Sequence, residues 1–300
     1  MDREVCFYSG SVKIAGTFTF PNTDKEEKKP AIILSHGYGA SRNEFGDFIL
    51  LSKKLGEKGI ASLRFDNRGC GTTDYPLGRM LCDVEWKEDL LNAINFVSSY
   101  PGIDPKRIGL IGESMGGANV LQTAAYENKS KCVIALSAIA SGNDWVKDLW
   151  LTNKTNKEYE YFLSTLQEDK IINSVYGRSN LVKMKDALPY PQRYVELIEI
   201  LKDRFESSEF TYYIELASIN SILSLSPIKS IEDISSKHLI LMAGKRDGIV
   251  PWEKNSKLLY EKAKCSKEIK LFGDGEHGLL AEPTKKEALD FILDSLEKYL

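Results

Sequence analysis

The 300-residue chain has few histidines, and its cysteines form no recognisable pattern. Only three histidines are present, so any histidine-dependent site has few candidates. The five cysteines are odd in number and widely spaced, and they include no Cys-x-x-Cys pair. This usage argues against a disulfide framework and against a zinc site. Reduced thiols are typical of a cytoplasmic protein, which is the location that we expect.

Strong net charge and long apolar runs are missing as well. A net charge of −3 offers no basic surface for nucleic acid. The N-terminal segment has no apolar stretch typical of a signal peptide, and no run is long enough to span a membrane. The chain also lacks a P-loop, a Gly-x-Gly-x-x-Gly turn after its first strand and a His-Glu-x-x-His helix. We therefore expect a protein that uses no metal and no cofactor.

The chain does contain short apolar runs that alternate with helical patterns. Residues 4–20 predict two antiparallel strands around Ser9 and Gly10. Strands apolar on both faces that alternate with helices favour a mostly parallel, twisted sheet with helices on both sides. The predicted buried strands are 31–35, 60–65, 108–111, 133–136, 238–243 and 268–272, with helices over 44–58, 86–100, 252–264 and 284–299.

The alternation stops after Ser141. From there to about Leu225 the strand-like runs vanish, and lysine, glutamate and aromatic residues dominate. Helical spacing is clear in 158–172 and 191–204. The simplest organisation is a core of residues 1–141 and 227–300 that carries a mainly helical cap insertion, residues 142–226. We expect most aromatic residues of the insertion to form its own core and a few to face the site.

The segment Gly112-Glu-Ser-Met-Gly116 joins a strand pattern to a helical pattern. A turn this sharp exposes the hydroxyl of Ser114 and requires almost no side chain two positions away on either side. Gly-x-Ser-x-Gly also arises by chance, so the interpretation of Ser114 as a nucleophile depends on partners elsewhere in the chain. The thiol of Cys70 is a weaker alternative, because no motif pairs it with a histidine.

A serine nucleophile needs a base, and the base needs a carboxylate that fixes its tautomer. His277 lies in a glycine-rich loop after the last predicted strand, at the edge where open α/β sheets hold their sites. His238 begins a strand at the opposite end and is expected to pack. Asp247 follows the preceding strand and is the favoured acid. Asp66 is its competitor, although the glycines around it suggest a carboxylate that holds its own loop.

The oxyanion of an acyl-transfer reaction needs amide donors that already point at it. The N–H of Met115, directly after Ser114, is one candidate. The other belongs to the turn His36-Gly37-Tyr38-Gly39, where we favour Tyr38. We expect His36 and Gly37 to have a structural role or to shape the substrate-binding site. Whether the Tyr38 phenol reaches the oxyanion or lines the pocket is left open.

Five motifs together resemble the α/β-hydrolase superfamily. They are the two turns above, Asp66-Asn-Arg-Gly-Cys-Gly71, Gly-x-x-Asp247-x-x-Val-Pro251 and Gly273-Asp-Gly-Glu-His-Gly278. The chain is similar to serine esterases and S33/S9 aminopeptidase-like hydrolases, including cinnamoyl and feruloyl esterases, over residues 5–141 and 227–300. The resemblance implies Ser114 as nucleophile, His277 as base and Asp247 as its acid, with the amides of Tyr38 and Met115 as oxyanion hole. Cys70 and Thr72 depart from the usual pattern of the Asp66 loop.

The expected function is hydrolysis of carboxylic esters through an acyl-enzyme. A small-molecule ester with an aromatic or medium acyl group would enter beneath the cap, and a homo-oligomer is compatible with the sequence. A serine peptidase or amidase with the same triad is the alternative, and it would need acids in the cap to bind a free amino terminus. Glu196, Glu199, Glu206 and Glu209 are available for that, or form a solvated helix face. A non-catalytic ligand receptor is the contrasting class.

Overall fold

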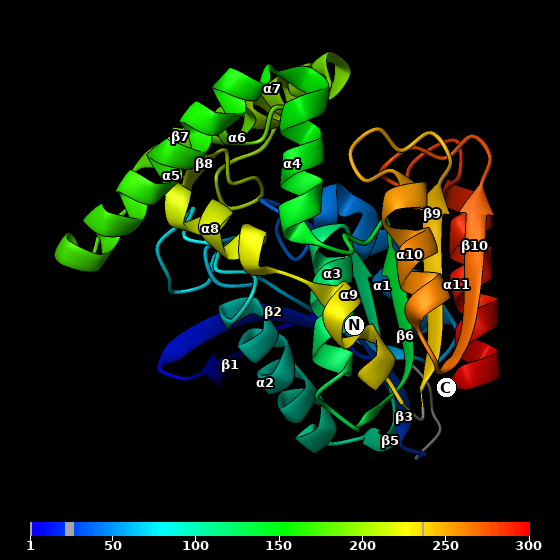
Figure 1. The fold of residues 1–300 in the computed structure, drawn as a ribbon. Coiled ribbons are helices and arrows are strands. Elements are labelled where there is room, and N and C mark those ends of the chain that lie inside the picture. Colours follow the sequence, from blue (N-terminus) through cyan, green and yellow to red (C-terminus); the bar gives the residue numbers. More distant parts are fainter. Residues whose placement is uncertain (1, 22–26, 236) are drawn as a thin grey trace.

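The structure is a computed structural model that describes residues 2–21, 27–235 and 237–300. In these residues eight strands form one central sheet in the order β1-β2-β4-β3-β5-β6-β9-β10 (Figure 1). The strands are β1 (Asp2–Ser9), β2 (Val12–Thr19), β3 (Lys29–Ser35), β4 (Ala61–Phe65), β5 (Ile103–Glu113), β6 (Ser130–Leu136), β9 (His238–Gly244) and β10 (Ser266–Phe272).

The pairing of the strands decides where the site forms. β1 and β2 make the predicted antiparallel hairpin, and β2 runs antiparallel to β4. The other neighbouring strands are parallel. The carboxyl ends of β3, β5, β6, β9 and β10 therefore meet at one edge of the sheet, and the loops that follow them lie close together. This confirms the expected α/β-hydrolase fold class.

Helices cover both faces of the sheet, as predicted from the apolar runs. One apolar cluster lies under α2 (Glu85–Ser99), α3 (Met115–Ala124) and α10 (Ser256–Lys262). A second lies under α1 (Asp47–Glu57) and α11 (Lys285–Tyr299) on the opposite face. Among the described residues, no helix combines the length and apolarity that crossing a bilayer requires.

Most residues between β6 and β9 lie beyond the carboxyl edge of the sheet (Figure 1). They form α4 (Gly142–Asn153), α5 (Asn156–Tyr176), α6 (Met184–Ala187), α7 (Gln192–Arg204) and α8 (Leu216–Ser224). The chain then returns along the face of the sheet through α9 (Pro227–Ser230) and the short η2 (Ile231–Asp233), which pack on the cluster under α3 and α10. The two helices predicted here correspond to α5 and α7. The expectation that strands vanish here is wrong in one detail: β7 (Leu181–Lys183) and β8 (Tyr213–Glu215) pair as a small antiparallel sheet.

A third apolar cluster joins this segment to the sheet. Trp86 and Met115 from the core pack in one cluster with Trp145, Ile214 and Ile219 from the inserted segment. All five side chains are buried. The insertion therefore covers the end of α3 that begins at the serine turn.

Candidate active site

The serine turn has the geometry that its glycines predict. Ser114 connects β5 to α3 with φ 55° and ψ −113°, a conformation that L-residues rarely adopt. A Cβ on Gly112 would lie 2.1 Å from the carbonyl oxygen of Gly116, and one on Gly116 would lie 2.0 Å from that of Ser35. The Ser114 amide donates to the Leu136 carbonyl on β6 at 2.8 Å. The strained turn is thus fixed to the sheet, and its hydroxyl is presented at the sheet edge.

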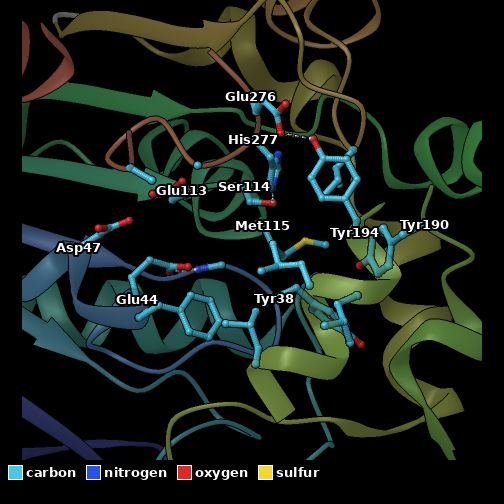
Figure 2. Close-up of a pocket in the computed structure, with 18 of the residues that line it drawn as sticks. Tyr38, Glu44, Asp47, Glu113, Ser114, Met115, Tyr190, Tyr194, Glu276 and His277 are labelled. Atoms are coloured by element: carbon cyan, nitrogen blue, oxygen red, sulfur yellow. Dashed lines mark hydrogen bonds between the residues drawn. The ribbon is translucent and has the colours of Figure 1, made fainter. Parts of the chain in front are cut away.

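The structure brings Ser114, His277 and Asp247 into one hydrogen-bonded line, of which Figure 2 shows Ser114 and His277. His277 Nε2 is 2.9 Å from Ser114 Oγ, and His277 Nδ1 is 2.8 Å from Asp247 Oδ2. The other oxygen of Asp247 accepts from the amides of Ile249 and Val250, both at 2.8 Å. The carboxylate is therefore oriented by its own loop and holds the imidazole with Nε2 toward the serine.

The charge of Asp247 controls the protonation of His277. Burial on its own would lower the pKa of the imidazole, but the charge of Asp247 and the hydrogen bond to it outweigh burial, and the pKa is raised. With the neutral ring protonated on Nδ1, Nε2 is free to accept the serine proton. The arrangement can therefore act as a general base.

The two residues expected to supply oxyanion donors belong to the pocket of Ser114. Tyr38 and Met115 both line the same pocket as Ser114. Met115 is the first residue of α3, so its N–H has no acceptor within the helix. Gly39 follows Tyr38 with φ +76°, and a Cβ there would lie 2.4 Å from Met184 Cε. The glycine lets the turn pass closely under the inserted segment, and the Tyr38 side chain reaches the pocket wall.

The other two histidines are structural. His36 is fully buried; its Nδ1 donates to the Gly37 carbonyl at 2.8 Å and its Nε2 accepts from the Asn67 amide at 3.0 Å. It therefore lies behind the turn rather than in the pocket, which corrects its expected place among the substrate-binding residues. Gly37 does line the pocket. His238 packs at the opposite end of the sheet, where its ring contacts Ser266 at 2.8 Å.

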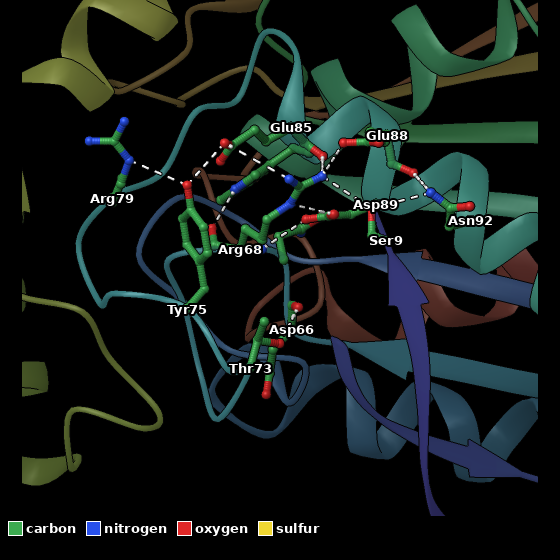
Figure 3. A network of polar contacts seen from close by, with 12 residues as sticks. Ser9, Asp66, Arg68, Thr73, Tyr75, Arg79, Glu85, Glu88, Asp89 and Asn92 are labelled. Atoms are coloured by element: carbon green, nitrogen blue, oxygen red, sulfur yellow. Dashed lines mark hydrogen bonds and ion pairs between the residues drawn. The ribbon is translucent and has the colours of Figure 1, made fainter. Parts of the chain in front are cut away.

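Asp66 holds its own loop and joins it to the loop that follows β3. Its carboxylate accepts from the amide of Arg42 at 2.7 Å, from the Arg42 guanidinium at 2.8 Å and from the amide of Thr72 at 2.9 Å. In the Asp66 loop, Arg68 forms an ion pair with the buried Asp89 at 2.7 Å (Figure 3). These contacts leave Asp247, not Asp66, as the carboxylate beside His277. They fit the structural interpretation that the glycines around Asp66 suggest.

Cys70, the alternative nucleophile, is unsuited to that role. Its side chain is buried and its Sγ lies 3.2 Å from the sulfur of Met80. Burial raises the pKa of this thiol, so the reactive thiolate is disfavoured. All five cysteines are free.

A cavity of about 820 Å³ opens over Ser114, and residues from both parts of the chain line it. On one side the inserted segment contributes Tyr190 and Tyr194, which face the serine turn in Figure 2. The remaining apolar lining residues of the segment are Trp145, Met184, Leu197, Ile198, Leu201 and Phe210. As expected, a few aromatic residues of this segment line the cavity. Others pack inside the segment itself: the rings of Trp150 and Phe162 stack with their centroids 4.3 Å apart.

Three carboxyl groups on the other side of the pocket were missed by the sequence analysis. Glu44, Asp47 and Glu113 all line the cavity (Figure 2). Burial raises the pKa of each; for Glu44 it reaches about 8. Glu113 lies inside the Gly-x-Ser-x-Gly motif, but the other two come from a helical stretch with no motif. Their convergence is visible only once the chain is folded.

The glutamates of the insertion are mostly engaged elsewhere. Glu199 bonds Lys185 at 2.8 Å and the Tyr212 hydroxyl at 2.6 Å. Glu209 accepts hydrogen bonds from Ser41 at 2.6 Å and from Asn43 at 2.9 Å. It therefore joins this segment to the loop that follows β3. Glu196 accepts from Gln192 on the same helix. Three of the four candidate acids for an amino terminus, Glu196, Glu199 and Glu209, therefore serve contacts within the protein.

Residues 26–284 match the family described as serine aminopeptidase, S33. The chain belongs to this family. A protein of Escherichia coli, described as an uncharacterized 31.7 kDa protein in the traX-finO intergenic region, is 31% identical over 268 residues, which are 88% of each chain. The match of the family to most of the chain identifies it as an α/β hydrolase.

Solved structures show the same fold at low identity. The α/β hydrolase GrgF from Penicillium sp. sh18 superposes with a TM-score of 0.82 at 19% identity, covering 100% of this chain and 99% of that one. Est1E from Butyrivibrio proteoclasticus, solved with ferulic acid bound, gives a TM-score of 0.67 at 16% identity, covering 98% of both chains. The expected resemblance to the superfamily is confirmed by the family match, and these solved structures share the fold.

Proposed function

We propose that this family member is a serine carboxylesterase that acts through an acyl-enzyme. The observation that carries the proposal is the hydrogen-bonded line from Asp247 through His277 to Ser114, which ends in the large cavity. Such a line activates a hydroxyl that is otherwise a poor nucleophile at neutral pH. We further infer that residues 142–226 act as a cap that provides the apolar wall of the substrate site.

Each step follows from the position of these groups. His277 Nε2 takes the proton of Ser114 as its oxygen attacks the ester carbonyl, and Asp247 stabilises the imidazolium that forms. The amides of Tyr38 and Met115 donate to the oxyanion. His277 then protonates the departing alcohol. A water, deprotonated by His277, attacks the acyl-enzyme and releases the carboxylic acid and the free serine.

The cavity supports esters with an apolar or aromatic acyl group. Its volume lies within the range of about 300–1,000 Å³ that is usual for small-molecule sites. Tyr190, Tyr194 and Phe210 offer ring surfaces against which an acyl group can pack. The engagement of Glu199 and Glu209 within the protein favours an esterase over an aminopeptidase, because these carboxylates are not free to bind an amino terminus.

A substrate panel tests this assignment. We expect p-nitrophenyl butyrate, octanoate and ferulate to be turned over with kcat/KM at least roughly a hundredfold above that for aminoacyl p-nitroanilides of similar size, since an apolar acyl group gains burial in the cavity. Initial rates with purified enzyme provide the measurement. Faster turnover of the anilides than of every ester would favour the peptidase alternative.

The acidic side of the pH profile should report His277. Because Asp247 raises the pKa of His277, the ring stays protonated, and inactive as a base, to a pH above its ordinary value of about 6.5. We expect kcat/KM for an uncharged ester to rise with pH through a midpoint above 6.5. A midpoint clearly below 6.5 would contradict this effect of Asp247. Initial rates in buffers of constant ionic strength check it.

A further inference from the structure

The carboxyl group of Glu44 supports the turn that carries one oxyanion donor. The amide of Gly37, one residue before Tyr38, donates to Glu44 Oε2 at 2.5 Å. Gly37 has no side chain that would separate the two: a Cβ there would already lie 3.2 Å from Glu44 Oε1. Glu44 is 7% exposed and lines the cavity, so its carboxyl lies between the turn and the substrate space (Figure 2).

The backbone around Glu44 is fixed in an unusual conformation. Glu44 and Phe45 both have positive φ, 42° and 54°, which is rare for residues other than glycine. The residues just before them, Ser41 and Asn43, donate to the carboxylate of Glu209 from the inserted segment. A strained conformation persists only where its surroundings enforce it, and such positions cluster at functional sites. Here the result is that the Glu44 side chain points at the Gly37 amide.

Two further acids lie near Glu44 in the pocket. Asp47 from α1 and Glu113 from β5 line the same side of the cavity, and neither they nor Glu44 form an ion pair within the described residues. Glu113 is 5% exposed, and its Oε2 has no hydrogen-bond partner in the described part of the chain.

Two other charged groups act on these neighbouring acids. The charge of Lys285 lowers the pKa of Asp47, although burial outweighs it, and the charge of Asp247 raises the pKa of Glu113. Burial, reinforced by Asp47, outweighs the opposing effects of the Gly37 amide and His277 and raises the pKa of Glu44 to about 8. Glu44 therefore remains uncharged at neutral pH.

We propose that Glu44 is a positioning residue for ester hydrolysis, whose uncharged carboxyl holds Gly37, and with it the Tyr38 amide, in place for the oxyanion. The inference rests on the proposed function. A carboxyl C=O accepts the Gly37 hydrogen bond without bringing a negative charge next to the site where negative charge develops. An ionised Glu44 would oppose the oxyanion by like-charge repulsion, which is strong in a buried site.

Ionisation of Glu44 would also stabilise the imidazolium of His277, with the opposite effect on rate. The hydrogen bond places Glu44 one residue from the Tyr38 amide, whereas Glu44 affects the pKa of His277 less than Asp247 does. The effect on the oxyanion therefore dominates. We expect kcat/KM to fall roughly tenfold or more as Glu44 loses its proton.

The test compares the alkaline side of the pH profile in three proteins. The kcat/KM for an uncharged p-nitrophenyl ester is measured between pH 6 and 10 in the wild type, Glu44→Gln and Asp47→Asn. The wild type should lose roughly tenfold above about pH 8, the pKa of Glu44. Glu44→Gln keeps an acceptor for Gly37 but cannot ionise, so its profile should stay flat there. Asp47→Asn removes a charge that opposes ionisation of Glu44, so its decline should begin at a lower pH.

Further measurements separate positioning from a purely structural role. Glu44→Ala should lower kcat at every pH with little change in KM, and Glu44→Gln should restore it near pH 7. In the wild type, Glu44 is protonated in the folded state up to about pH 8 but ionises near 4.5 when unfolded, so its contribution to stability is lost progressively as pH rises through that window. Glu44→Gln should accordingly reduce the fall of Tm between pH 5 and 8.

The proposal is overturned if the wild type shows no alkaline decline, or if Glu44→Gln declines as the wild type does. These tests require a wild type that hydrolyses the ester and is labelled at Ser114 by a fluorophosphonate at neutral pH. A wild type with neither ester turnover nor labelling would instead contradict the proposed function. Failure of the Glu44 proposal and failure of the proposed function can therefore be told apart.

Discussion

Replacing Ser114 with alanine should abolish hydrolysis of p-nitrophenyl esters and labelling by a fluorophosphonate. The substitution removes the atom that would bond to the acyl group, while the line from Asp247 to His277 remains. Loss of a triad nucleophile reduces kcat by roughly 10⁴-fold or more, and the residual rate comes from binding and the oxyanion donors. Rates at saturating ester and labelling followed by intact mass give the two measurements.

Ser137 provides the matched control for this experiment. It lies after β6 near the site, also has positive φ (46°), and its hydroxyl donates to the His277 carbonyl at 3.0 Å. Ser137→Ala should therefore keep fluorophosphonate labelling and measurable turnover. Labelling that survives in Ser114→Ala but disappears in Ser137→Ala would show that the nucleophile has been assigned to the wrong serine. Near-ultraviolet circular dichroism of both variants checks that each is folded.

The part of the site encoded by local patterns could be predicted from the sequence. Ser114 is recognisable because its turn needs glycines at fixed spacing, and a strand and a helix flank it. His277 and Asp247 follow apolar strands whose parallel pairing puts both loops at the same edge. The same reasoning gave the sheet, because continuous apolar runs are typical of strands buried on both faces.

What could not be predicted depends on contacts between distant segments. The pocket acids Glu44, Asp47 and Glu113 come from three elements, and nothing in the spacing of the first two indicates that they face the serine. β7 and β8 have three residues each, too few for an alternating pattern to be visible. The role of His36 required knowing that the Asn67 amide meets its ring.

α7, which belongs to the proposed cap, contacts the loops of both His277 and Asp247. Arg193 on α7 pairs with Glu276, directly before His277, at 2.9 Å and donates to the Arg246 carbonyl, directly before Asp247, at 3.2 Å. Tyr194 also lines the cavity. α7, which lines the cavity, is therefore connected to the loops that carry His277 and Asp247.

Replacing Asp247 with asparagine should reduce kcat by roughly 10⁴-fold while leaving KM within a few-fold of the wild type. The asparagine amide can occupy the same space, but it no longer fixes the proton on His277 Nδ1 or stabilises the imidazolium, and such a change in a comparable triad costs about this much. The acidic limb should also move to lower pH, because Asp247 raises the pKa of His277. Full pH profiles of kcat and kcat/KM provide the measurement.

Asp66→Asn is the control that separates the proposed role of Asp247 beside His277 from the general effect of removing a buried carboxylate. Asp66 is 1% exposed and Asp247 is 5% exposed, so the two substitutions disturb similarly buried carboxylates. Asp66 bonds Thr72 in its own loop and Arg42 in the loop after β3, so its loss should lower Tm while kcat/KM near neutral pH stays within roughly tenfold of the wild type. If Asp66→Asn instead reduced kcat more than Asp247→Asn, with both proteins folded, Asp247 would not be the acid that serves His277.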